Sequence, residues 1–260
     1  MERALNPRAV TSLGNETVKS VRALHLRKAR EQSGLFLAEG LKIVTEAIEL
    51  GHRPRILLYA AEAAQHPLLL RARMAATDAL EVTSAILAKV SRRENPQMVL
   101  GVFEQKFAPL ADLRAGRLIG LEAVRDPGNL GTIVRTADAA GCAGVILIGD
   151  CCDPWSVEAV RATMGSIFSV PVARASRDAF LAWRAGWPGQ VIGTLLTAET
   201  DFRAANYGPN SLILLGNEQA GLTPALAESC DLAVKIPMRG RADSLNLAAA
   251  AAIMAYAASG

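Results

Sequence analysis

The feature that most limits how this chain can fold is the alternation of apolar strands with helical patterns across residues 118–260. Strands that are apolar on both faces are typical of a mostly parallel sheet, with helices covering both sides. The expected strands are 118–124, 145–148, 168–172, 191–195, 212–215 and 232–236, and the expected helices are 130–140, 156–163, 177–186, 224–228 and one that starts at 244. Ligands bind beyond the carboxyl ends of such strands. A site is therefore expected in the loops that follow Val124, Leu195, Leu215 and Ile236.

The first part of the chain predicts a smaller α/β unit. A helix is expected over 15–31 and another over 41–51, and the expected strands are 35–40, 55–59, 79–82 and 98–103. Residues 106–117 are interpreted as a linker. The predicted organisation is therefore a small α/β domain over 1–105, a linker, and a large α/β domain over 118–260.

Composition narrows the class of protein. About half of the 260 residues are apolar, so a packed core is expected. No apolar run reaches the ~20 residues of a membrane-spanning helix, and the first ten residues carry no apolar signal-peptide core. The four cysteines have no CxxC spacing and lie far from the three histidines, so neither a disulfide framework nor a metal site is expected. We therefore expect a cytoplasmic protein with reduced thiols.

Charge is unevenly distributed along the chain. Residues 1–105 hold 15 Lys and Arg against 11 Asp and Glu, whereas residues 106–260 hold 13 against 14. A basic front segment on a neutral body indicates that the front binds a polyanion such as RNA, although a solvated helix face would show the same charges. The candidate RNA-binding residues in this segment are Lys19, Arg22, Arg27, Lys28 and Arg30.

The first of three candidate motifs is RDPGNLGTIVRTADAAG, residues 125–141. Asn129 is a plausible helix N-cap after a turn, and the helix that follows has a stripe of apolar residues at helical spacing. Arg135 lies opposite that stripe, where a guanidinium could bind a phosphate. The alternative is that Asn129 only caps the helix and Arg135 only pairs with Asp138.

The second motif is LILLGNEQAGL, residues 212–222, in which a buried strand runs into Gly216 and Glu218. Glycine at a strand end lets the backbone approach a ligand closely. Glu218 would then lie over the site, although the same residues would also suit an ordinary strand–helix loop.

The third motif is KIPMRGRADSLNLAAAAAIMAYA, residues 235–257. Ser244 is the expected N-cap of a helix that is apolar on nearly every side, so this helix should be buried by its own sheet and by a partner subunit. Asn246 is harder to explain as helix structure alone, because a buried amide needs hydrogen-bond partners.

Several other motifs are absent from the sequence. It has no GxGxxG, GxxxxGK[ST] or GxSxG, so a dinucleotide-dependent oxidoreductase, a P-loop enzyme and a serine hydrolase are not supported.

In this order and spacing, the three motifs resemble those of the SpoU (TrmH) family of SPOUT methyltransferases. Residues 18–48 and 91–103 are similar to the family's small substrate-binding domain. The resemblance implies S-adenosyl-L-methionine as cofactor, methylation of an RNA ribose 2′-hydroxyl, a trefoil knot in the C-terminal sheet domain and a homodimer formed by that domain.

The resemblance also assigns roles to residues at the matching positions. Catalysis would involve Asn129, Arg135, Glu218, Ser244 and Asn246, with Arg135 also contacting the RNA. The cofactor would be held by Thr194, Leu195, Gly216, Asn217, Ile236, Met238, Ser244 and Leu245.

The chemistry leaves the general base open. Methyl transfer needs alignment of oxygen, methyl carbon and sulfur, and removal of the hydroxyl proton. A guanidinium stays protonated in proteins, so our hypothesis is that Arg135 binds the phosphate and stabilises the developing alkoxide. Ribosomal RNA is the expected substrate. The alternatives are a tRNA methyltransferase and an RNA-binding protein with a vestigial methyltransferase fold.

Overall fold

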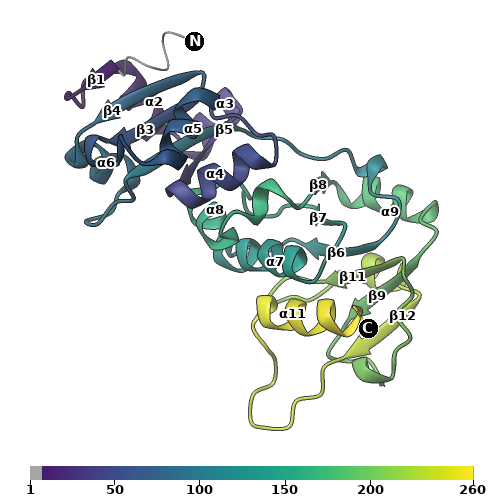
Figure 1. The fold of residues 1–260 in the computed structure, drawn as a ribbon. Helices are drawn as coiled ribbons and strands as arrows, with labels where there is room; N and C mark the ends of the chain where they lie inside the picture. The colour runs from purple at the N-terminus through teal and green to yellow at the C-terminus, as the bar shows by residue number, and fades with distance from the viewer. Residues whose placement is uncertain (1–7, 260) are drawn as a thin grey trace. The chain divides into compact units, whose positions relative to one another are not determined.

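The computed structural model describes residues 8–259, which form two compact units (Figure 1). One unit takes in the chain up to Gln105 and also Trp155–Ser169. The other runs from Lys106 to Pro154 and from Val170 to the C-terminus. Among the described residues, no helix is long and apolar enough to cross a membrane.

The first unit is built on a five-stranded sheet in the order β1-β4-β3-β5-β2. Strands β1, β4 and β3 are parallel, and β5 runs antiparallel to both β3 and β2. The four strands expected here are present, and the structure adds the short β1. The strands are β1 Arg8–Val10, β2 Leu35–Glu39, β3 Ile56–Ala60, β4 Asp78–Val82 and β5 Val99–Glu104. The helices are α2 Glu16–Ala23, α3 Arg27–Ser33, α4 Leu41–Glu49, the short η1 Ala61–Ala63, α5 Pro67–Ala75 and α6 Ser84–Ser91.

The prediction of a single helix over 15–31 is wrong, because the structure has two helices there, α2 and α3. At the break, the His25 Nε2 lies 2.7 Å from the carbonyl oxygen of Val90. Arg30 was expected to project into solvent, yet it is only 4% exposed. Its Nη1 donates a hydrogen bond of 2.7 Å to the Leu24 carbonyl, which helps to satisfy the buried guanidinium. Arg30 therefore belongs to the packing of this unit and is withdrawn as an RNA-binding residue.

The segment Trp155–Ser169 contains α8 Val157–Thr163 and η3 Ser166–Phe168, and it packs within the first unit. Trp155 lies against Phe36, with ring centroids 4.7 Å apart, and Phe168 lies 4.8 Å from Phe103. Arg161 also forms a two-pronged ion pair with the buried carboxylate of Glu39. These contacts join residues far apart in sequence, which explains why a linear boundary could not assign this segment to the first unit.

The second unit is a seven-stranded sheet in the order β10-β12-β9-β11-β6-β7-β8, and every pairing in it is parallel. This confirms the predicted parallel sheet. The strands are β6 Arg117–Glu122, β7 Gly144–Ile148, β8 Val172–Ala175, β9 Gln190–Thr194, β10 Thr200–Asp201, β11 Ser211–Leu215 and β12 Leu232–Lys235. The helices are η2 Leu110–Asp112, α7 Pro127–Ala139, α9 Arg177–Ala185, η4 Phe202–Ala204, α10 Pro224–Glu228 and α11 Leu247–Ala257.

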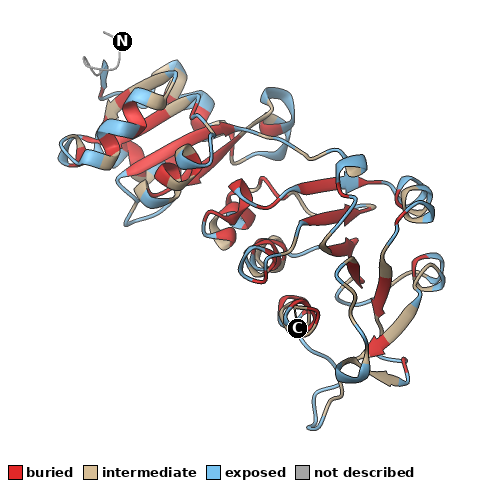
Figure 2. Ribbon diagram, turned by 45° about the vertical axis from the view of Figure 1, so that its right-hand side comes forward, coloured by how far each residue is buried: buried red, intermediate tan, exposed pale blue. Residues whose placement is uncertain are grey.

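Helices cover both faces of this sheet, and most strand residues between them are buried (Figure 2). On one face, Phe180 of α9 and Leu226 of α10 join a core with Leu118 and Leu212 of the strands. On the other face, α11 packs against α7 and β11. Within residues 106–117, expected as a linker, Arg117 begins β6, and Leu113 is 5% exposed and joins the same core as Phe180.

Candidate functional site

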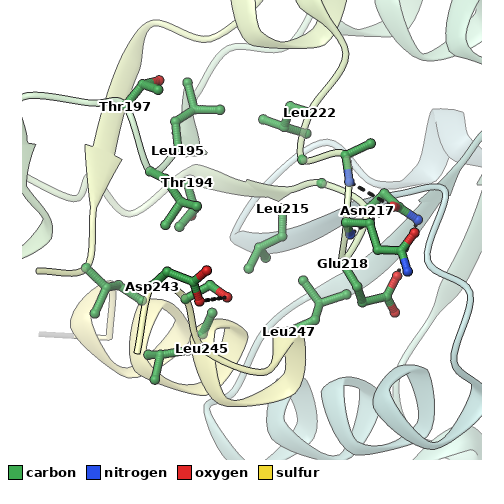
Figure 3. A pocket seen from close by; sticks show the side chains of 18 of the residues that line it. Thr194, Leu195, Thr197, Leu215, Asn217, Glu218, Leu222, Asp243, Leu245 and Leu247 are labelled. Atoms are coloured by element: carbon green, nitrogen blue, oxygen red, sulfur yellow. Dashed lines mark hydrogen bonds between the residues drawn. The ribbon is translucent and has the colours of Figure 1, made fainter. Parts of the chain in front are cut away.

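A cavity of about 610 Å³ lies where strands β9, β11 and β12 end, next to the start of α11 (Figure 3). This is the edge of the sheet where a site was expected. The eight residues predicted to hold the cofactor all line this one cavity: Thr194, Leu195, Gly216, Asn217, Ile236, Met238, Ser244 and Leu245. The sequence analysis did not name several of its apolar walls, which are Leu196, Leu215, Leu222, Leu247 and Ala250. They are ordinary apolar residues, and only their position in the fold identifies them as part of the cavity wall.

One wall of the cavity is a tight backbone hairpin from the second motif. Asn217 N donates to Gly221 O at 3.0 Å, and Gly221 N donates to Asn217 O at 2.9 Å. A Cβ on Gly216 would lie 2.0 Å from the carbonyl carbon of Gly221, so only glycine allows the two backbones to come this close. The Asn217 Oδ1 accepts hydrogen bonds from the backbone N–H groups of Gln219 and Ala220, which closes the turn.

The opposite wall offers an unpaired polar atom. The hydroxyl oxygen of Thr194, at the end of β9, is buried and has no hydrogen-bond partner in the structure. Buried polar atoms normally have a partner, so an unpaired one that lines a cavity suits a polar ligand group. The cavity thus combines apolar side chains with an unpaired hydroxyl, which is how small-molecule sites are commonly built.

The carboxylate of Glu218 connects the second motif to the first. It accepts a hydrogen bond of 3.3 Å from Arg125 N, one of 3.4 Å from Asp126 N and one of 3.4 Å from the Asn129 Nδ2. The Asn217 Nδ2 also donates to it at 3.3 Å. These four donors around one carboxylate hold the loop after β6 against the loop after β11.

Asn129 and Asn246 extend this network to the third motif. The Asn246 Nδ2 donates to the Asn129 Oδ1 at 2.9 Å, although the two residues are 117 positions apart. The Asn246 Oδ1 accepts from the backbone N–H groups of Ala248 and Ala249 at the start of α11. The network of Glu218, Asn129 and Asn246 therefore joins all three motif loops.

Both predicted helix caps in the motifs are wrong. Asp126 caps α7, accepting a hydrogen bond of 2.6 Å from Asn129 N, so Asn129 lies in the first turn and its side chain is free for the network. Asn246 caps α11, whereas Ser244 is an exposed residue on the cavity wall whose hydroxyl lies 3.4 Å from the Asp243 Oδ1. Asn129 and Asn246 are thus linked by side-chain bonds that no local pattern predicts.

Arg135 does not line the cavity or join the network. It is exposed on α7, opposite the buried stripe of Leu130, Ile133, Val134 and Ala137, as expected. Within residues 8–259, Arg135 makes no ion pair with Asp138, so the structural alternative for this arginine finds no support. Its guanidinium is available to a partner outside this chain.

The remaining basic residues of α2 and α3 are exposed. Lys19 pairs with Glu16 at 2.8 Å and Arg27 pairs with Glu31 at 2.7 Å, whereas Arg22 and Lys28 are simply exposed. Exposed pairs of this kind are weak, so they do not prevent either cation from binding phosphate instead.

Cys152 lies near the carboxylates of the first two motifs, but its thiol is unreactive. Burial, with smaller contributions from Cys151, Glu218 and Asp126, raises the pKa of the Cys152 thiol to about 12. The thiol is therefore neutral at physiological pH and is not a nucleophile. Among the described residues, no three His, Cys, Asp or Glu side chains gather as they would around a metal ion.

Taken together, a parallel sheet with a cavity at its carboxyl edge, built from three loops, defines an α/β protein with a site for a small molecule. The chain belongs to the SpoU rRNA Methylase family, whose model matches residues 116–256. Residues 15–101 match the MRM3-like substrate binding domain. The resemblance inferred from the three motifs is thereby confirmed.

Similar proteins extend over almost the whole chain. The 23S rRNA (guanosine(2553)-2′-O)-methyltransferase RlmP of Bacillus subtilis is 32% identical over 95% of this chain and 97% of its own length. The 23S rRNA (uridine(2479)-2′-O)-methyltransferase of Streptomyces viridochromogenes is 32% identical over 99% of this chain and 93% of its own. The crystal structure of an AdoMet-bound rRNA methyltransferase from Sinorhizobium meliloti superposes with a TM-score of 0.90 at 44% identity, covering 96% of this chain and 97% of that one.

Proposed function

We propose that this protein transfers a methyl group from S-adenosyl-L-methionine to a ribose 2′-hydroxyl of ribosomal RNA. The observation that carries the proposal is the network of Glu218, Asn129 and Asn246, which holds the three motif loops together beside the cavity. Both full-length relatives above are named as 2′-O-methyltransferases of 23S rRNA, which favours ribosomal RNA over tRNA. One is named for guanosine and the other for uridine, so the relationship does not choose the base.

The cavity suits S-adenosyl-L-methionine on its own geometry. Leu222 and Leu247 offer apolar contacts, and the Thr194 hydroxyl can hydrogen-bond a polar group. When bound, this cofactor supplies a methyl group already activated by its sulfonium. The protein's task is then to align the ribose and to stabilise charge on its oxygen.

The proposed roles of the chain's residues follow from the network. Asn129 and Asn246 place amide groups next to the cavity, where they can orient the ribose. Glu218 orders the loops, since its oxygens already accept four hydrogen bonds. Arg135 binds the RNA phosphate and stabilises the developing alkoxide, a role that its exposed guanidinium permits.

The test is methylation of ribosomal RNA with radiolabelled S-adenosyl-L-methionine, followed by mapping of alkali-resistant positions. We expect label at a 2′-O position with the wild-type protein and strong loss with Asn129→Ala. Labelled bases, or no binding of the cofactor in calorimetric titration, would refute the proposal. Cofactor and RNA binding without any transfer would instead support the vestigial alternative.

We also propose a homodimer formed through α11. On this helix Leu247, Ala251 and Met254 face its own unit, whereas Tyr256 is 56% exposed and Ile253 is half-buried. An apolar helix face beside α7 suits a second copy of the chain. The trefoil knot, implied by family resemblance, and the cytoplasmic location, implied by a ribosomal RNA substrate, remain predictions of the same proposal.

A further inference from the structure

The loop that follows β11 is held at two points, Asn217 and Thr223, by two consecutive residues: Glu122 at the end of β6 and Ala123 after it. At one end, the Asn217 Nδ2 donates to the carbonyl oxygen of Ala123 at 2.8 Å. At the other end, the Glu122 Oε2 accepts from Thr223 N at 2.8 Å, and the Glu122 Oε1 accepts from the Thr223 hydroxyl at 2.9 Å. The loop between these anchors, residues 218–222, lines the cavity, and its last residue is Leu222.

Glu122 is an unusual residue to find at this place. Its side chain is only 1% exposed, although a buried carboxylate is costly unless it is paired and fully hydrogen-bonded. Arg177, at the start of α9, supplies the charge partner through a bond of 2.6 Å between its Nε and the Glu122 Oε1. One carboxylate therefore accepts three hydrogen bonds, and two of them go to a single residue, Thr223.

The backbone next to Glu122 is also strained. Ala123 has a φ of +51°, in the left-handed region that a residue with a Cβ rarely adopts. Such strain persists where surrounding contacts hold it, and it tends to occur at functional sites. Here it aims the Ala123 carbonyl at Asn217 while the preceding Glu122 side chain reaches Thr223.

We propose that Glu122 is a positioning residue that sets the shape of the cofactor cavity through Thr223. It touches neither the cavity nor the reacting atoms. Its hydrogen bonds to Thr223 fix the backbone there, and this positions the neighbouring Leu222. Together with the bond between Asn217 and Ala123, they hold the hairpin in place as a wall of the cavity. This inference rests on the proposed function, because the ligand of the cavity is taken to be S-adenosyl-L-methionine.

The experiment measures S-adenosyl-L-methionine affinity by calorimetry and backbone hydrogen exchange across residues 216–223 in the full-length protein. For Glu122→Ala we expect a dissociation constant raised by roughly tenfold or more, because two donors of Thr223 lose their acceptor. Faster exchange should be confined to the hairpin. Thr223→Val removes only the hydroxyl donor and should weaken binding less, and Thr223→Ser should restore it relative to valine.

A matched control separates positioning from general destabilisation. Leu80→Ala disturbs the buried core of the first unit, which contains none of the residues that line the cavity, and should lower the melting temperature without changing cofactor affinity. If Glu122→Ala fails to fold, the valine–serine pair at Thr223 still decides the matter. Equal affinity in all variants would overturn the role of Glu122 while leaving the proposed function intact. A wild-type protein that binds no cofactor would overturn the proposed function itself.

Discussion

At the residue scale, the role of each side chain in the site depends on its chemical group and on the hydrogen bonds that orient it. Glu218 and Glu122 are both carboxylates, but Glu218 is exposed and shared among four donors, whereas Glu122 is buried and committed to Thr223 and Arg177. The hydrogen bonds of both carboxylates go to other residues of the loops and of α9, so both serve to hold the loops in place. Arg135, by contrast, is exposed on α7, and in our proposal it contacts the RNA.

The role of Arg135 predicts the behaviour of two variants. In Arg135→Ala we expect kcat to fall by roughly 100-fold or more, because the charge that stabilises the developing alkoxide is lost. Arg135→Lys keeps a positive charge but lacks the two-pronged geometry and should recover only part of the rate. Single-turnover rates of methylation, measured for both variants over a range of pH, would test this prediction. A near-normal rate in the lysine variant would exclude both proposed roles.

At the scale of elements, the same residue can serve a helix and the site at once. Asn246 caps α11 with its Oδ1 and reaches Asn129 with its Nδ2. Asp126 caps α7 and so frees Asn129 for that contact. The N-terminal ends of α7 and α11 are therefore the places where the first and third motif loops contact each other.

Two substitutions at Asn246 should separate these tasks. Asn246→Ala removes the cap and should cost about 1 kcal/mol of unfolding free energy as well as activity. Asn246→Asp keeps a capping oxygen, and carboxylate charge suits a helix N-terminus, so stability should hold while methylation falls.

Ser244→Ala is the matched stability control for these two variants. Because Ser244 is not the cap, its loss should leave the denaturant midpoint unchanged. Full activity in Asn246→Asp would show that the contact with Asn129 is not needed.

At the scale of the whole molecule, our proposal assigns RNA binding to the basic first unit and methyl transfer to the second unit, which holds the cavity. The triple variant Lys19→Glu, Arg27→Glu, Lys28→Glu should weaken RNA binding and reduce the slope of log affinity against log salt by about 2–3. Affinity for S-adenosyl-L-methionine should not change. Reversal of Lys42, Arg53 and Arg71, which are also exposed on this unit, is the matched control. Unchanged RNA affinity in the first triple would remove α2 and α3 from the RNA surface.

Dimerisation through α11 makes a second prediction at this scale. Tyr256→Asp places a charge on the exposed apolar face of the helix and should convert a dimer into a monomer in sedimentation. Met74→Asp, at a residue that is 71% exposed on the first unit, should leave the dimer unchanged. A wild-type monomer at micromolar concentration would contradict the proposal.

The amino-acid sequence was enough to predict the parallel sheet, the edge at which the cavity lies and the residues of the three motifs. Apolar periodicity and strand-end glycines are local signals, and they report burial and close backbone approach directly. Three features could be seen only in the folded chain: Arg30 is buried, Asp126 and Asn246 are the caps, and Trp155–Ser169 packs in the first unit. Each of these depends on contacts between residues distant in the chain, such as the 117 positions between Asn129 and Asn246, which no local pattern records.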